Sequence, residues 1–185
     1  MSDVAGADDP KFLAWIDLET TGLDERRDHI LEVALVLTRW EPTLEEVASL
    51  SLVVKPDAKD WEDRMDETVR KMHDRSRLLR EVPYGVSIHE AKWAIEDLFD
   101  KNGEPGDYML AGSGVQFDRR FIAEDMRSLI PWLAYPIFDV GVVRRFVRLS
   151  GAEVETDLGR VKHRAMADVV RHLAEAREFL TWMAS

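Results

Sequence analysis

Residues 11–33, KFLAWIDLETTGLDERRDHILEV, decide the fold, because they place two acids in a segment that otherwise belongs in a protein core. The segment opens with an apolar run that is typical of a buried strand. On a strand, residues two apart point to the same side, so Asp17 and Glu19 project together and Leu18 points away. A buried carboxylate without a partner costs several kcal/mol. The segment therefore predicts acids that are held by a cation or a similar partner.

The composition limits the kinds of protein that this chain can be. It has 185 residues, of which 45% are hydrophobic, and this suits one folded domain with a substantial core. No stretch approaches the roughly 18 consecutive apolar residues of a membrane helix, and the acidic start MSDVAGADDP does not resemble a secretory signal. We therefore expect a soluble, cytoplasmic protein with no membrane partner.

Cysteine content and charge narrow the chemistry further. Because the chain has no cysteine, a metal would be bound by carboxylates, histidines, carbonyl groups and water, which suit hard cations. The formal net charge is −11, from 25 basic and 36 acidic residues, and it disfavours a broad basic face for long nucleic acid. A short nucleic-acid footprint stays open, since bound divalent cations would offset clustered acids locally.

The pattern along the chain predicts a mobile tail, residues 1–10, followed by one α/β domain, residues 11–185. Strands are predicted at residues 11–19, 29–40, 44–55, 107–112 and 136–140. Helices are predicted within residues 61–79 and at 87–99, 118–130, 142–149 and 166–183. We expect a central mixed sheet flanked by helices. Three tryptophans in patterned segments are expected in the core: Trp15, Trp93 and Trp182.

Two later segments add acids and a histidine to the first pair. GSGVQFDRRFI, residues 112–122, places Asp118 near the start of a helix, just after a glycine-rich strand end. HRAMADVVRHL, residues 163–173, places His163 before a helix and Asp168 within it. Five residues would set these two well apart around a continuous helix, so we expect His163 on the preceding loop. A histidine there is free to lean over the site as a mobile base.

These segments, in this order, resemble the three motifs of the DEDDh family of 3′-to-5′ exonucleases, and most closely those of the oligoribonucleases. WIDLETTGL resembles the first motif, GSGVQFDRRFI the second and HRAMAD the third, and the resemblance extends from Lys11 to the final helix. It implies a ribonuclease H-like fold. It also implies that His163 is the general base and that two Mg²⁺ or Mn²⁺ ions are bound by Asp17, Glu19, Asp118 and Asp168.

The resemblance further implies hydrolysis of short single-stranded RNA from its 3′ end, with release of nucleoside 5′-monophosphates and with DNA as a second candidate substrate. Two hard cations roughly 3.5 to 4 Å apart stabilise charge on both the attacking and the leaving oxygen. Carboxylates supply the ligands and the compensating charge. A proofreading or RNA-trimming exonuclease that acts on longer strands is the alternative within the same class.

Several residues are predicted to contact the substrate. Thr20, Thr21 and Gly22 form a polar turn whose amides and hydroxyls suit a terminal sugar or phosphate, although a plain strand-ending turn is an alternative. Under the resemblance, His73 matches a histidine that stacks on the 3′ base, and Leu18 matches a leucine that wedges against the bases. The alternatives are a solvated histidine and an ordinary core leucine.

Two departures from the oligoribonuclease pattern concern substrate length. In the oligoribonucleases, a serine and an arginine cap the 5′ phosphate of a dinucleotide. Gly114 and Pro136 occupy the corresponding positions here. Charge-assisted contacts that would reject longer chains are therefore lost, and nearby Ser113 and Gln116 replace them only in part. We expect activity on single strands longer than two nucleotides.

The resemblance also bears on assembly. Tyr135 matches a tyrosine that reaches into the partner subunit's site, which implies a homodimer, although a core or rim tyrosine is the alternative. Asp139 precedes a helix and is better interpreted as its N-cap than as a ligand. Two non-enzymatic alternatives are a module that only binds single-stranded ends and a structural Ca²⁺ site. All five motif positions are present, and the ligands are too dispersed for a compact calcium loop.

Overall fold

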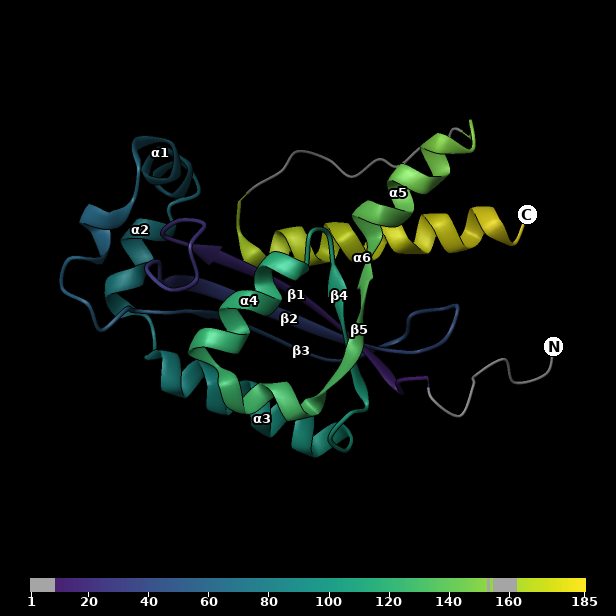
Figure 1. Cartoon of the computed structure of the whole chain (residues 1–185), viewed down its shortest axis with the longest axis horizontal. Coiled ribbons are helices and arrows are strands. Elements are labelled where there is room, and N and C mark those ends of the chain that lie inside the picture. The colour runs from purple at the N-terminus through teal and green to yellow at the C-terminus, as the bar shows by residue number, and fades with distance from the viewer. Residues whose placement is uncertain (1–8, 153, 155–162) are drawn as a thin grey trace.

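The computed structural model describes residues 9–152, 154 and 163–185 and shows a twisted sheet between two layers of helices (Figure 1). Within the described ranges, five strands form one mixed sheet in the order β3-β2-β1-β4-β5. β1 pairs with β2 in antiparallel and with β4 in parallel orientation. The predicted central mixed sheet is therefore confirmed. The strands are β1 (Phe12–Thr20), β2 (Ile30–Arg39), β3 (Glu46–Val53), β4 (Tyr108–Gly112) and β5 (Leu133–Asp139).

The helices pack on both faces of the sheet, with α5 and α6 on one face and α3 and α4 on the other. The predicted short helices between β3 and α3 are also present. The α-helices are α1 (Glu67–Arg75), α2 (Leu78–Glu81), α3 (Ile88–Asn102), α4 (Gln116–Asp125), α5 (Val140–Leu149) and α6 (Ala165–Met183). The 3₁₀ helices are η1 (Trp61–Arg64), η2 (Val82–Tyr84) and η3 (Arg127–Trp132). No helix in these described ranges is both long and apolar enough to cross a membrane.

β1 lies at the centre of the sheet and contributes to the core on both sides. Its alternate side chains divide as the period of two requires: Ile16 and Leu18 pack toward α3 and α4, whereas Leu13 and Trp15 pack toward α6. Asp17 belongs to the second row. The carboxylates therefore occupy the end of a row that is apolar at its start, on the side of the sheet that α6 covers.

β1 extends beyond its parallel neighbour, and this exposes part of its edge. The last residue of β1 that pairs with β4 is Trp15, which lies beside Ala111. At the end of β4, a Cβ added to Gly112 would lie 2.9 Å from the carbonyl oxygen of Ile16, so glycine permits this close approach. Beyond this point the backbone of β1 is free to meet residues of α4.

The predicted helix at residues 118–130 was wrong in its bounds. The α-helix begins earlier, at Gln116, and ends at Asp125, and a 3₁₀ helix then continues from Arg127 through Pro131 to Trp132. Proline fits there because its fixed φ suits a short 3₁₀ turn near the end of the element. β5 consequently begins at Leu133, three residues before the predicted start at Pro136.

The predictions for the tryptophans were correct for one residue of three. Trp15 is fully buried and donates a hydrogen bond to Thr38 Oγ1 at 3.0 Å. Trp93 is 65% exposed and Trp182 is 40% exposed, so their assignment to the core was wrong. Trp93 lies opposite the face that α3 buries, and Trp182 lies in the last turn of α6.

The N-terminal prediction is only partly within the described ranges. Residues 1–8 of the predicted tail lie outside the described residues. Pro10 is buried, and the chain joins the sheet immediately after it, since the amide of Lys11 donates to the carbonyl of Asp107 at 2.9 Å.

Candidate active site

Three of the four predicted acids meet at the end of β1. Asp17 and Glu19 come from β1 and Asp168 comes from the first turn of α6, and one carboxylate oxygen from each lies within 4.8 Å of the others. Glu19 and Asp168 are buried, and Asp17 is half-buried. In Figure 1 the tip of the β1 arrow ends beside the start of α6, which is the place where this cluster forms.

The fourth acid, Asp118, is anchored to the strand between the first two. It lies in the first turn of α4 and is buried, and its Oδ1 accepts a hydrogen bond from the backbone N–H of Leu18 at 2.9 Å. This contact is available because β1 extends past β4. Asp118 is also close enough for its charge to raise the pKa of Asp17. The four acids therefore act on one another electrostatically.

Burial and crowding make the carboxyl groups of Asp17, Glu19 and Asp118 hard to ionise. Burial, followed by the charge of Asp118, raises the pKa of Asp17 from 3.8 to about 9. Burial, followed by the charge of Asp168, raises the pKa of Glu19 to about 8. The pKa of Asp118 rises to about 7 through burial, against the effect of its backbone hydrogen bonds. A bound divalent cation would favour the ionised forms, and oxygen donors of this kind suit a hard ion.

His163 lies on the loop before α6, where the sequence placed it. Its side chain is exposed, and its backbone has the left-handed φ of +50°. A non-glycine residue with positive φ is uncommon and is often found where the surrounding structure imposes a particular direction on the side chain.

His73 is fully buried, so the alternative of a solvated side chain was wrong. Its Nε2 donates a hydrogen bond to the carbonyl of Thr20 at 2.8 Å, and its Nδ1 lies 3.7 Å from Oε2 of Glu19. Burial lowers the pKa of this histidine, the bond to Thr20 opposes the shift, and the nearby charge of His163 lowers the pKa further. His73 therefore stabilises the end of β1 through its bond to Thr20. Its contact with a 3′ base stays a prediction.

The turn after β1 uses its hydroxyl groups internally. Thr20 Oγ1 donates to the carbonyl of Gly22 at 2.6 Å, and Thr21 Oγ1 accepts from the N–H of His29 at 2.9 Å. A Cβ on Gly22 would lie 2.4 Å from Oδ2 of Asp28, so glycine lets that carboxylate close the loop. Thr21 is fully buried, and the half-buried Gly22 is the more accessible part of this turn.

The remaining predicted contact residues lie around the start of α4 and on β5. Ser113 is half-buried, Gln116 is exposed, and Tyr135 is 92% exposed on β5. Gly114 has the left-handed φ of +76°, and its N–H donates to Asp139 Oδ2 at 3.0 Å. Asp139 Oδ1 accepts from the N–H of Val142, so its assignment as an N-cap is confirmed.

A buried glutamate next to the cluster was missed in the sequence. Glu32 of β2 lies directly opposite Glu19 in the strand register and is 2% exposed. Its carboxylate pairs with Arg164, the residue after His163. The signal was present as an acid inside the apolar run ILEVALVL, the same pattern that marked Asp17 and Glu19.

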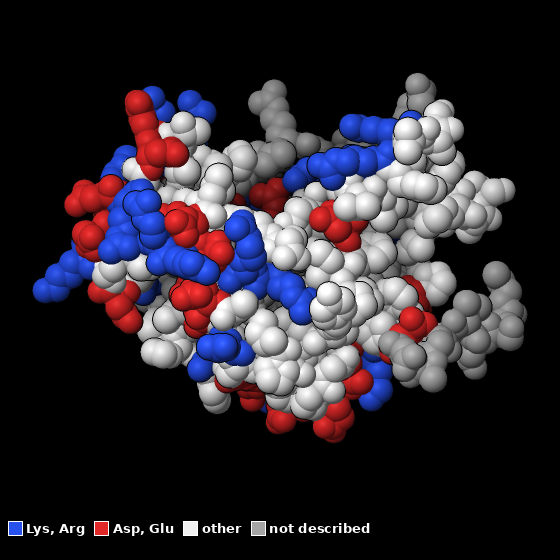
Figure 2. Space-filling view, viewed as in Figure 1, with Lys and Arg blue, Asp and Glu red and all other residues white. Residues whose placement is uncertain are grey.

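Acidic and basic side chains lie close together on the face of the molecule that Figure 2 shows. Figure 2 shows acidic atoms at the bottom of a hollow, with lysine and arginine side chains gathered over the α1 and α2 region and over α5. Arg171 lies inside the site, with its guanidinium 3.3 Å from Asp168 Oδ1. This distribution of charge suits a substrate that carries phosphates.

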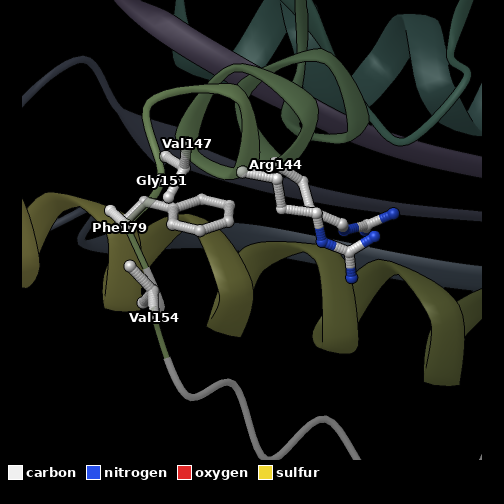
Figure 3. Close-up of a pocket in the computed structure, with 7 residues that line it drawn as sticks. Arg144, Val147, Gly151, Val154 and Phe179 are labelled. Atoms are coloured by element: carbon white, nitrogen blue, oxygen red, sulfur yellow. The ribbon is translucent and has the colours of Figure 1, made fainter.

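A separate cavity lies between α5 and α6 (Figure 3). Its volume is about 440 Å³, and it contains none of the predicted site residues. Arg144, at one side of the cavity, forms an ion pair with the buried Glu175. The cavity is lined by Arg144, Val147, Arg148, Gly151, Ala152, Val154 and Phe179.

The sheet and its helices define a fold of the ribonuclease H-like class. Exonuclease I of E. coli, in its zinc-bound complex with single-stranded DNA, has the same fold, with a TM-score of 0.73 and 18% identity over 95% of this chain. Exonuclease I of Methylocaldum szegediense is similar, with a TM-score of 0.67 and 22% identity over 90% of this chain. The chain spans 41% and 40% of those two proteins, so the likeness concerns the fold alone.

The particular family follows from the sequence. The family model described as Exonuclease (RNase T) matches residues 14–176, so the chain belongs to this exonuclease family. The oligoribonuclease of Leifsonia xyli subsp. xyli is 36% identical over 166 residues, covering 88% of this chain and 79% of that protein. The oligoribonuclease of Tropheryma whipplei is 34% identical over 168 residues, covering 90% of each. The chain is thus a nuclease that hydrolyses phosphodiester bonds, and its acidic cluster suits the divalent metal ions that the family uses.

The pKa shifts predict how pH affects the stability of the metal-free protein. An unfolded chain releases the Asp17 proton near pH 3.8, whereas the folded protein keeps it to about pH 9. The metal-free fold therefore loses stability as the pH rises through this window. At pH 8 in chelator, the free energy of unfolding of Asp17→Asn should exceed that of wild type by about 1 kcal/mol or more, because wild type must take up a proton or bury a charge on folding and asparagine does neither.

Thermal melts in EDTA at pH 5 and pH 8 measure this effect. The advantage of Asp17→Asn should be larger at pH 8, and added Mn²⁺ should stabilise wild type more than the variant. A variant that is less stable than wild type in EDTA at pH 8 would contradict the burial of a repelled charge at this position.

Proposed function

We propose that this protein is a 3′-to-5′ exonuclease that degrades short single-stranded RNA and releases nucleoside 5′-monophosphates. The observation that carries the proposal is the convergence of Asp17, Glu19 and Asp168, with Asp118 fastened to the strand between the first two. The oligoribonucleases at 34 to 36% identity support RNA as the substrate. Single-stranded DNA is a second candidate substrate, as in the exonuclease I complex.

The cofactor in this proposal is a pair of Mg²⁺ or Mn²⁺ ions. The four acids named above would hold them, because a crowded set of carboxylate oxygens favours hard cations. Two such ions, when bound, stabilise negative charge on the attacking and leaving oxygens of the phosphodiester. In this proposal His163, which is exposed on the loop before α6, accepts the proton of the attacking water.

The protein's own residues orient the 3′ end of the substrate. We assign the backbone at Gly22 to the terminal sugar, and Ser113 and Gln116 to the phosphates. Leu18 is the predicted contact to the bases, and because it is 6% exposed and packs toward α3 and α4, it would have to move to reach them. The Thr20 and Thr21 hydroxyls are engaged in the turn, and the Thr21 N–H donates to the carbonyl of His29 at 2.9 Å, so the proposed contact falls to the backbone of Gly22. For His73 to stack on a base, its side chain would have to move from its buried position.

A homodimer would cover exposed side chains of β5 and α5. Tyr135 is 92% exposed, and α5 presents an apolar stripe formed by Val142, Phe146 and Leu149, which are 58%, 71% and 85% exposed. These three residues share one face of the helix at spacings of four and three. An exposed apolar face of this kind is typical of an interaction surface. We propose that a second copy of the chain covers it and brings Tyr135 to the partner's site.

Removing the proposed base or a ligand should abolish turnover without unfolding the protein. His163→Ala should lower kcat by about 10²- to 10⁴-fold on a short RNA. Asp168→Asn should lower it at least as much, because it removes a carboxylate ligand. The measurement is the release of nucleoside 5′-monophosphate with Mg²⁺ or Mn²⁺, with a thermal melt to confirm folding. Turnover near the wild-type rate in Asp168→Asn would defeat the assignment of the site.

Substrate length should be discriminated only weakly. Gly114 and Pro136 provide neither a hydroxyl nor a guanidinium to cap a 5′ phosphate, and the φ of +76° at Gly114 disfavours any side chain there. RNAs of two, five and twenty nucleotides, labelled at the 5′ end, should therefore be degraded with kcat/KM values within about tenfold of one another. A preference for the dinucleotide of several hundredfold would show instead that other residues close the site.

Disrupting the α5 stripe should separate the proposed dimer. Light scattering after gel filtration should give wild type twice the chain mass of 21.3 kDa, and Phe146→Asp should give the chain mass itself. Trp93→Asp, at an exposed tryptophan on the opposite layer, is the matched control and should remain dimeric. If wild type is a monomer at micromolar concentration, the proposal of a homodimer is wrong.

A further inference from the structure

The guanidinium of Arg164 is fixed between two carboxylates from different elements. Nε and Nη2 donate to Glu32 at 3.1 and 2.9 Å, and Nη1 and Nη2 donate to Glu81 at 3.0 and 2.8 Å. Glu32 is buried in β2, whereas Glu81 lies on the exposed surface of α2. The planar fork of arginine matches both carboxylates at once, so its orientation is set from two directions.

Glu32 also holds the start of α6. Its Oε2 accepts the backbone N–H of Ala165, the first residue of that helix, at 3.0 Å. In the strand register Glu32 lies opposite Glu19, one of the acids of the cluster. The same carboxylate therefore connects the strand pair that carries the cluster to the two residues that follow His163.

His163 immediately precedes the residues that this connection holds. Its side chain is exposed, and its backbone adopts a left-handed φ of +50° immediately before the residue that the two glutamates hold. Since the next residue is fixed and α6 begins one residue later, the backbone at His163 has little freedom on that side. The fixed position of Arg164 therefore limits the directions in which the His163 side chain can leave the loop.

We infer that Arg164 is a positioning residue for the reaction: through its fork to Glu32 it orients His163 over the acidic cluster. The inference rests on the proposed function, in which His163 accepts a proton from the attacking water. Arg164 acts through His163 and has no assigned contact with the substrate. In addition, its charge balances that of Glu32, so that this fifth acid is held by arginine.

Arg164→Lys is the appropriate substitution, because it keeps a positive charge beside Glu32 and removes the planar fork. We expect kcat on a five-nucleotide RNA to fall by about 10- to 100-fold, with KM changed by less than about threefold. In a His163→Ala background the same substitution should change kcat by less than about twofold, because the group that it positions is absent. A purely structural effect would lower kcat by the same factor in both backgrounds.

Arg177→Lys is the matched control on the same helix. Arg177 donates to the carbonyl of Leu44 and pairs with the exposed Glu46. Neither partner is one of the two glutamates that hold Arg164. Its kcat should stay within about twofold of wild type. If Arg164→Lys fails to fold, Glu81→Gln is the second variant, because it weakens the exposed pair of Arg164 with Glu81 and keeps the buried pair with Glu32. It should lower kcat about threefold when His163 is present and leave kcat unchanged in His163→Ala.

The outcomes separate this inference from the proposed function. If His163→Ala loses activity while Arg164→Lys keeps it, only the positioning role is wrong. An equal loss from Arg164→Lys in both backgrounds also overturns that role. If His163→Ala turns over RNA at the wild-type rate, the proposed base is wrong, and the positioning inference is wrong with it.

Discussion

The crowding of like charges at the end of β1 is the constraint on which the rest of the structure depends. Three carboxylates approach to within 4.8 Å, and burial and mutual repulsion oppose the ionisation of two of them, Asp17 and Glu19. A fold can keep such a cluster only if other interactions fix the segments that carry it. β1 meets this need, because it is the central strand, with cores on both faces and pairing on both sides over its first half. The repulsion within the cluster destabilises the metal-free fold at the position where a bound cation would offset it.

The buried acids near the site divide into two groups by their partners. Glu32 and Glu175 are each paired with an arginine, and Asp118 accepts a backbone N–H. Within the described part of the chain, Asp17 and Glu19 have no lysine or arginine at ion-pair distance. This division leaves Asp17 and Glu19 without a basic partner, whereas Asp118 and Asp168 keep contacts within the protein, to the N–H of Leu18 and to Arg171, beside their proposed role as ligands. It also explains why the cluster is acidic even though arginines are close by.

Much of the site could be predicted from short-range patterns. The period of two in β1 predicted that Asp17 and Glu19 share a side, and the five-residue spacing before Asp168 predicted that His163 lies on a loop. Those inferences need only the geometry of a strand and a helix. The positions of Trp93 and Trp182 were predicted incorrectly, because a patterned element does not reveal which of its faces is covered. A helix exposes the side opposite its buried stripe, and large side chains can lie there too.

The support around the site could not be predicted in the same way, because it depends on pairings between distant segments. Arg164 and Glu32 are 132 residues apart, and 36 acids in the chain offer many possible partners for any one arginine. Only the register of β1 with β2 shows that Glu32 lies opposite Glu19, and only the packing of α6 brings Arg164 to it. The residues that perform the chemistry follow from local sequence rules, whereas the residues that hold them in place follow from topology. A buried acid in an apolar strand, such as Glu32, can be recognised in the sequence. Its partner can be identified only from the three-dimensional structure.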